Sequence, residues 1–144
     1  MAARFHQQRL SVVQQRVRMR ALYPGFTSTW ERGLIRWTGD LQPTDASERY
    51  RVAVAYRLDS TPKVHVLSPE LRTREDGQPI PHRYPEGNLC LYLTNSGEWT
   101  PNDYIAETTV PWTSLWLYYY EVWRATGAWL GGGVHAPKRN RPKR

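Results

Sequence analysis

Three short β-type stretches constrain the fold of this chain more than any other feature; they span residues 34–37, 50–56 and 64–67. Turn-forming residues separate them, and the connections are too short for crossover helices, so the strands are expected to be antiparallel neighbours. Within the middle stretch, alternate positions share aromatic or β-branched side chains: Tyr50, Val52, Val54 and Tyr56. Arg51 and Arg57 fall on the other face. This pattern predicts a three-stranded antiparallel meander with one buried face, followed by a fourth short strand.

Residues 1–22 contain no Gly, Pro or acidic residue, and they predict an amphipathic helix that ends at 23–25. At helical spacing one face collects the apolar side chains Leu10, Val13, Val17 and Ala21. The helix is strongly basic, and its arginines have two open interpretations: a solvated face, or a docking surface for an acidic partner or nucleic acid. The candidate partner-binding residues are Arg4, Arg9, Arg16 and Arg20.

A second helix is predicted over residues 102–126, with Pro111 either in its first turn or at a kink, and with Gly127 as its stop. Its large side chains recur at helical spacing and are expected to pack in the core: Trp112, Leu115, Trp116, Tyr119 and Trp123. The fold class is therefore α+β. We expect a single domain over residues 1–136 and a basic, disordered tail over 137–144.

Composition excludes several classes of protein. The 144 residues suit one domain, and 40% of them are hydrophobic, which argues against global disorder. Apolar runs are too short to span a membrane, and the Arg-rich start does not resemble a secretory signal. A single cysteine rules out an intramolecular disulfide, and four scattered histidines do not form a metal-site spacing. We expect a cytoplasmic protein with no metal and no cofactor.

The single thiol, Cys90, follows a long Arg-, Pro- and Gly-rich loop at 72–88. If residues 88–93 are extended, their leucines face the core while Cys90 points outward with its neighbours Asn88 and Tyr92. Gly87 permits a sharp reversal of the chain just before the thiol, and His82 lies within reach across the loop. A cysteine with a nearby histidine is also typical of Cys-His hydrolases, but no acid stands out to orient the histidine.

These residues resemble the ubiquitin-conjugating (UBC) family. The family's motif is carried here by His82, then Gly87-Asn88-Leu89-Cys90-Leu91, then Trp99-Thr100-Pro101. The resemblance covers about residues 1–126, and it is strongest to the small prokaryotic members of antiphage CBASS systems, which share the segment Trp129-Leu130-Gly131-Gly132-Gly133. Arg83 and Tyr84 replace the family's Pro-Asn, so the Asn that supports the oxyanion is missing. The chain also ends after one long helix.

The resemblance implies a UBC-like fold and a transferase. In that function Cys90 carries an acyl group as a thioester and passes it to a lysine amine. It assigns the oxyanion-stabilising role to His82, with Tyr84 and Asn88 as alternatives. His135, after the glycines, is a further supporting candidate. The implied partners are an activating enzyme supplied by another protein, and a cyclic-nucleotide synthase or ubiquitin-like protein as the conjugated species.

Two alternatives stay open. The first is a non-catalytic binding partner of a cyclic-nucleotide synthase on the same fold, with Cys90 incidental. The second is a basic nucleic-acid-binding domain that uses the N-terminal helix and the tail, because clustered Lys and Arg release counterions from phosphates. This last function ranks lowest, since the positive charge lies at the two ends of the chain and no recognition motif joins them.

Overall fold

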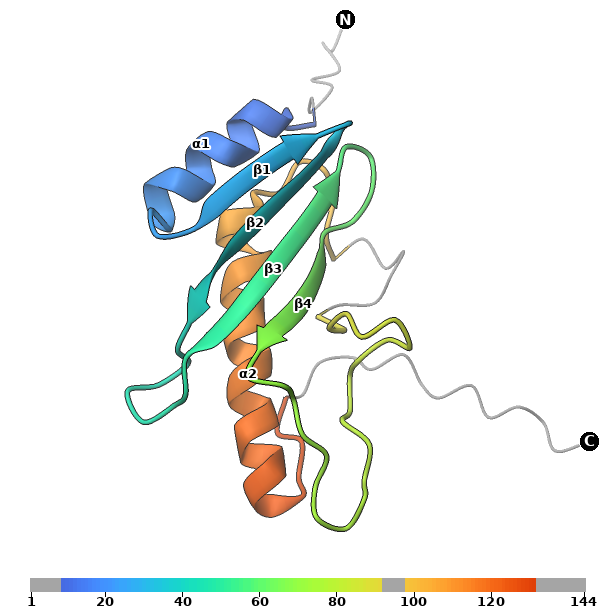
Figure 1. Cartoon of the computed structure of the whole chain (residues 1–144). Coiled ribbons are helices and arrows are strands. Elements are labelled where there is room, and N and C mark those ends of the chain that lie inside the picture. Colours follow the sequence, from blue (N-terminus) through green and yellow to red (C-terminus); the bar gives the residue numbers. More distant parts are fainter. Residues whose placement is uncertain (1–8, 92–97, 132–144) are drawn as a thin grey trace, which may run out of the picture.

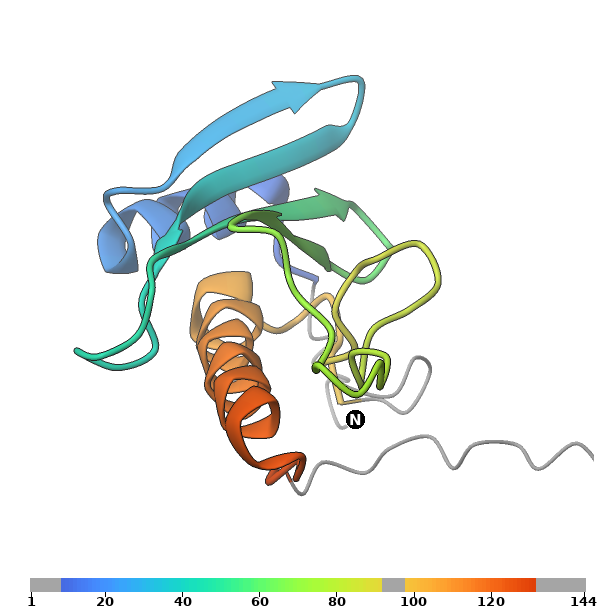
Figure 2. The same ribbon diagram turned by 60° about the horizontal axis from the view of Figure 1, so that its bottom comes forward.

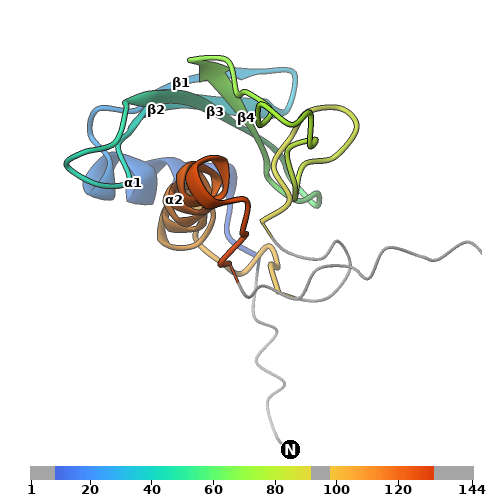
Figure 3. The ribbon, with the colours of Figure 1, turned by 90° about the horizontal axis from the view of Figure 1, so that it is seen from below.

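The computed structural model describes residues 9–91 and 98–131. In this part of the chain four strands form one antiparallel sheet in the order β1-β2-β3-β4. Helix α1 precedes the sheet and helix α2 follows it, and both lie on its concave face (Figure 1, Figure 3). The elements are α1 Val12–Leu22, β1 Thr27–Glu31, β2 Leu34–Leu41, β3 Tyr50–Arg57, β4 Lys63–Ser68, the 3-10 turn η1 Ile105–Glu107 and α2 Thr109–Thr126. The predicted α+β meander between two helices is confirmed.

The fourth strand, β1, comes before the three predicted strands rather than after them. It pairs with β2 through a tight turn at Arg32 and Gly33, which have φ values of 50° and 78°. Every residue of β1 is exposed, so the strand shows no alternation of buried and exposed positions for sequence reasoning to detect. The segment that was expected to follow as a strand makes an isolated bridge, Arg83 to Leu89, outside the sheet.

The predicted buried face of the first helix is wrong. The helix begins at Val12, capped by Ser11, whose side chain accepts from the backbone of Gln14. Val13 and Val17 are 56% and 65% exposed. The buried positions are instead Val12, Gln15 and Met19, while Leu10 is half-buried before the helix and Ala21 is exposed.

A buried glutamine explains this rotation of the helix. The side-chain amide of Gln15 donates to the carbonyl oxygen of Asp103 at 2.8 Å and accepts from the backbone N–H of Ile105 at 2.9 Å. A polar group whose hydrogen bonds are satisfied can be buried at little cost. Arg18, also on α1, pairs with Glu107 at 2.5 Å and adds a second link between α1 and η1.

The core lies between the concave face of the sheet and α2. The predicted face of β3 is confirmed, because Tyr50, Val52, Val54 and Tyr56 are all buried. They pack with β2 and β4 side chains and with α2, in a cluster that includes Ile35, Trp37, Val64, Val110, Trp116, Leu117, Tyr120 and Trp123.

The second helix departs from its prediction in two respects. It begins at Thr109 rather than near 102, which places Pro111 in its first turn, where a missing N–H costs no hydrogen bond. Leu115 is exposed, so its predicted place in the core is wrong. The predicted stop is confirmed, since Gly127 caps the helix in the left-handed conformation that suits glycine.

The loop between β2 and β3 is also fastened to α2. Ser47 donates to one carboxylate oxygen of Glu121 at 2.5 Å, and the hydroxyl of Tyr50 donates to the other at 3.1 Å. Burial raises the pKa of Tyr50, and the neighbouring Glu121 carboxylate raises it further. The loop, β3 and α2 therefore form one packed unit.

In the part of the chain that the structure describes, neither helix combines the length and apolar character needed to cross a bilayer. Some predictions fall outside residues 9–91 and 98–131. They are the roles of Arg4 and His135, the placement of Tyr92 and Leu93, and the tail at 137–144.

Candidate active site

The segment that carries Cys90 runs along the free edge of β4. After β4 the chain leaves the sheet in a long loop and returns beside the same strand, where the backbone N–H of Leu89 donates to the carbonyl oxygen of Val64 at 2.9 Å (Figure 2). Leu89 is buried in the core, as predicted. Cys90 comes next and is partly exposed. The residue is therefore not fully buried, which a thiol that reacts with external groups requires.

A tight turn brings Tyr84 to this thiol. The backbone N–H of Gly87 donates to the carbonyl oxygen of Tyr84 at 2.8 Å, and the N–H of Tyr84 donates to the carbonyl oxygen of Asn88 at 2.9 Å. Gly87 has a φ of 92°, so the reversal predicted at this glycine is confirmed. The turn leaves the Cys90 thiol 3.6 Å from the phenolic oxygen of Tyr84, to which it donates.

His82 contacts the backbone of Cys90 through its own backbone carbonyl group. Its carbonyl oxygen accepts the N–H of Cys90 at 2.8 Å and the indole N–H of Trp116 at 2.9 Å. Its imidazole packs against the ring of Trp129, with 4.8 Å between centroids. Because Trp116 belongs to α2 and is buried, these contacts tie the position of the Cys90 backbone to the core helix.

Asn88 is buried whereas Cys90 is partly exposed. Asn88 is 7% exposed, although strand alternation predicts the same side for both residues. The structure makes it a turn residue, and alternation holds only where the backbone is regularly extended. A hollow of about 230 Å³ opens next to this turn, lined by Thr61, Pro62, Lys63, Tyr84, Glu86, Asn88, Leu89 and Leu91.

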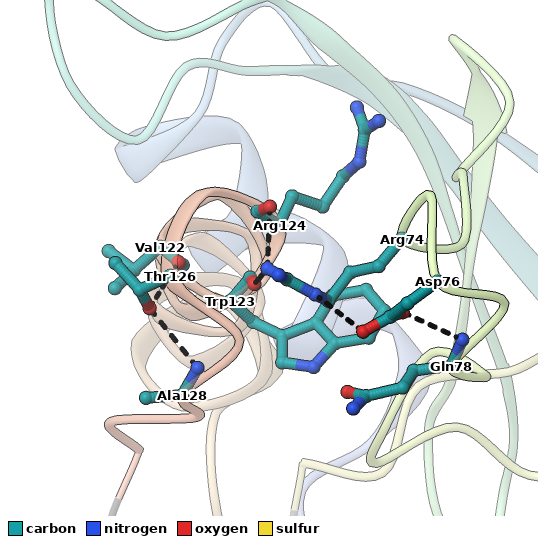
Figure 4. Close-up of polar contacts among 8 residues, drawn as sticks. All are labelled: Arg74, Asp76, Gln78, Val122, Trp123, Arg124, Thr126 and Ala128. Carbon is teal, nitrogen blue, oxygen red and sulfur yellow. Dashed lines mark hydrogen bonds and ion pairs between the residues drawn. The ribbon is translucent and has the colours of Figure 1, made fainter.

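The loop before the turn is anchored by a residue that sequence reasoning missed. The guanidinium of Arg74 donates to the carbonyl oxygens of Trp123 and Arg124, at 2.7 and 2.8 Å, in the last turn of α2 (Figure 4). Its Nε lies 3.6 Å from a carboxylate oxygen of Asp76, within ion-pair range but beyond a hydrogen bond. Carbonyl groups in the last turn of a helix lie at the negative end of its dipole, so a cation is favourable there.

A second anchor lies close to the first in sequence. The backbone N–H of Arg72 donates to the hydroxyl oxygen of Tyr120 at 2.7 Å. Both contacts join residues about fifty positions apart. No spacing or composition in the loop could have indicated them, because their partners are on a helix that comes later in the chain.

The arginines of α1 have different surroundings. Arg16 and Arg20 line a groove of about 550 Å³ beneath β1, together with the apolar side chains of Val13, Val17, Met19, Phe26 and Trp37. The guanidinium of Arg16 also lies over the ring of Trp30, 5.5 Å from its centroid. Arg9 is paired with Asp59 instead. The structure therefore brings two of the four predicted partner-binding arginines together at one groove.

The arrangement around Cys90 can support acyl chemistry by a thiol. Within residues 9–91 and 98–131, no three His, Cys, Asp or Glu side chains are grouped so that they could hold a metal ion. The thiol has a phenolic hydroxyl beside it, a hydrogen-bonded turn preceding it in the chain and an open hollow nearby. A nucleophile next to a hydrogen-bond donor is what an acyl transfer through a tetrahedral intermediate requires.

The meander, its two covering helices and the cysteine at the end of the long loop define the ubiquitin-conjugating, or E2-like, class of fold. The chain belongs to the E2-CBASS family, described as Type II CBASS E2 protein, whose model matches residues 15–136. It is thus an E2-like protein of CBASS antiphage defence. The members of this family are conjugating proteins that work with other components of the same system. No curated protein matches the chain.

Proposed function

We propose that this protein is an acyltransferase that carries an acyl group as a thioester on Cys90 and passes it to a lysine amine. The observation that carries the proposal is that Cys90 is partly exposed and that its sulfur lies 3.6 Å from the hydroxyl of Tyr84, in a chain of the E2-CBASS family. Membership of this family supports conjugation in general. The contact with Tyr84 supports a role for the thiol itself.

The first step is a transfer between thiols. The Cys90 thiolate attacks the carbonyl carbon of a thioester held by an activating enzyme. A new carbon–sulfur bond forms, the old one breaks, and the activating enzyme regains its thiol with one proton. In the second step a neutral lysine amine attacks the Cys90 thioester. A carbon–nitrogen bond forms, the Cys90 sulfur leaves, and the amine loses a proton to give the amide.

Both steps pass through a tetrahedral intermediate with a negative oxygen. We assign Tyr84 as the first candidate for the hydrogen-bond donor to this oxygen, because its hydroxyl lies beside the sulfur. A pre-placed donor of this kind contributes ~3–4 kcal/mol in acyl transfer. His82 is the second candidate donor, because its ring packs against Trp129 and its carbonyl oxygen accepts a hydrogen bond from the backbone N–H of Cys90. Asn88 is buried in the turn and acts as a positioning residue.

The activating enzyme is supplied by another protein, and we place its docking site on the groove beneath β1. Arg16 and Arg20 give this groove a positive rim around apolar walls, which suits an acidic segment with one apolar face. The conjugated species is a cyclic-nucleotide synthase or a ubiquitin-like protein of the same system. Its C-terminal carboxyl would be the acyl group.

The test uses cells that express the chain with its neighbouring genes. Wild type is expected to form a covalent adduct that a reductant removes. The Cys90→Ser variant is expected to trap an adduct that resists reductant, because an oxygen ester replaces the thioester. The Cys90→Ala variant is expected to form none, since the sequence holds no other cysteine. An adduct of unchanged amount in Cys90→Ala would contradict the proposal.

A further inference from the structure

Lysine is scarce in this chain. Of its 20 Lys and Arg residues, only Lys63, Lys138 and Lys143 are lysine. The two cations differ in chemistry, because arginine stays protonated under all ordinary conditions whereas a lysine amine can lose its proton and act as a nucleophile. Any lysine of this chain that lies near a thioester on Cys90 is therefore a candidate acceptor for its acyl group.

The single lysine among the described residues lies next to the site. Lys63 is the first residue of β4 and is exposed. It lines the same 230 Å³ hollow as Tyr84 and Leu91, the residue after Cys90. The hydrogen bond from Leu89 to Val64 holds the two segments side by side, so each strand residue next to this bond is close to the thiol-bearing segment.

Tyr84 connects the hollow to the thiol. It lines the hollow, which Cys90 itself does not, and its hydroxyl oxygen lies 3.6 Å from the sulfur of Cys90. Glu86 lines the hollow as well, and a carboxylate there attracts a lysine side chain and can take up the proton that the amine loses. The long, flexible stem of a lysine lets its amine reach into such a space.

We propose that Lys63 is an internal acceptor for the acyl group on Cys90, an inference that rests on the function proposed above. The neutral amine of Lys63 attacks the thioester carbonyl. The carbon–nitrogen bond forms, the carbon–sulfur bond breaks, the Cys90 sulfur leaves as thiolate, and the proton of the amine passes to Glu86 or to water. The product is an isopeptide bond on Lys63 and a free thiol on Cys90.

The experiment uses the purified full-length chain and one small donor. The donor is a biotin-labelled peptide ending in Gly-Gly, activated as the thioester of 2-mercaptoethanesulfonate, so that no other protein is needed. Wild type is expected to form a reductant-sensitive adduct first and a reductant-resistant adduct later, with peptide mapping placing the second on Lys63. Lys63→Arg is expected to keep the first adduct and to lose at least about tenfold in the second.

Three control variants test whether the position of Lys63, and not the general reactivity of a lysine amine, determines where the resistant adduct forms. The double variant Lys138→Arg/Lys143→Arg is expected to behave as wild type. Arg36→Lys in the Lys63→Arg background adds a lysine at an exposed position of β2, and it is expected not to restore the resistant adduct. Cys90→Ala is expected to form neither adduct, which shows that the acyl group reaches Lys63 through the thiol.

The outcomes separate the two proposals. A resistant adduct that persists in Lys63→Arg, that maps to Lys138 or Lys143, or that forms unchanged in Cys90→Ala overturns the internal acceptor and leaves the proposed function standing. A wild-type chain that forms no reductant-sensitive adduct with this donor overturns both proposals, because its thiol is then not available for acyl transfer.

Discussion

At the β1 edge of the sheet every strand residue is exposed, and the chain places beneath it a groove lined by Arg16 and Arg20. At the β4 edge the chain instead folds back on itself, and the backbone of Leu89 bonds to Val64. An unpaired strand edge presents free N–H and C=O groups. Here the carbonyl oxygen of Val64 at the β4 edge accepts a hydrogen bond from the segment that carries the thiol, while the β1 edge borders an open groove suited to a partner.

The two regions also differ in the contacts that stabilise them. The β4-edge segment, residues 69–91, depends on polar anchors to α2 through Arg74, Tyr120 and Trp116. The β1-edge region depends on close packing, because Phe26 lies against the backbone of Gly39 with no space for a larger residue. Changes at the turn beside Cys90 should therefore alter chemistry, changes in the polar anchors should alter local stability, and changes in the β1-edge region should alter stability or docking.

The largest expected effect is at the β4 edge. Tyr84→Phe removes the hydroxyl beside the sulfur and keeps the ring, so acyl transfer is expected to fall about 10²–10³-fold, with little change in the free energy of unfolding. The measurement is the rate of thioester formation and discharge with the peptide thioester. Tyr118→Phe, at an exposed position on α2, is the matched control. Equal rates for both variants would remove Tyr84 from the chemistry.

The next effect is at the β1 edge. A Cβ on Gly39 would lie 2.1 Å from the ring of Phe26, so Gly39→Ala forces strand or ring to move and is expected to lower the free energy of unfolding by about 2–3 kcal/mol. Chemical denaturation measures this. Gly25→Ala, with no neighbour near its added Cβ, is the control. Loading of Cys90 with the peptide thioester is expected to be unchanged at temperatures where the variant is folded.

A smaller effect is expected from the anchor between the loop and α2. Arg74→Met removes two hydrogen bonds to helix carbonyl oxygens while keeping much of the apolar stem, and it is expected to cost up to about 2 kcal/mol. Hydrogen exchange should then show faster opening of residues 72–88 than of β1 and β2. Arg124→Met, in the same region of α2 but with an exposed side chain, is the comparison. Uniform loss of protection across the chain would contradict a local role for Arg74.

The smallest effect concerns the groove. Arg16→Ala removes a cation from its rim and a cation–π contact with Trp30 worth about 0.5–1 kcal/mol. We expect slower loading of Cys90 in cells, where a partner supplies the acyl group, and unchanged loading by the peptide thioester in vitro. Arg49→Ala, in the exposed loop before β3, is the control. A loss of loading in both assays would mean that Arg16 acts on the fold and not on docking.

The sequence alone determined the features that depend on local pattern. Alternation in 50–56 fixed which face of β3 is buried, Gly127 fixed where α2 ends, and Gly87 fixed the reversal before Cys90. Each of these follows from the conformational preferences of a few adjacent residues, so it can be read without knowing what packs across the chain.

Only the tertiary structure decided the rest. Gln15 is buried because Asp103 and Ile105 lie across from it, and this contact turns Val13 and Val17 toward solvent. In the same way the partners of Arg74, the 3.6 Å contact between Tyr84 and Cys90, and the wall that Lys63 shares with Tyr84 all depend on segments that meet only in the folded chain. Local periodicity carries no information about such tertiary contacts, because burial and hydrogen bonding depend on residues that are distant in the sequence and adjacent only in the fold.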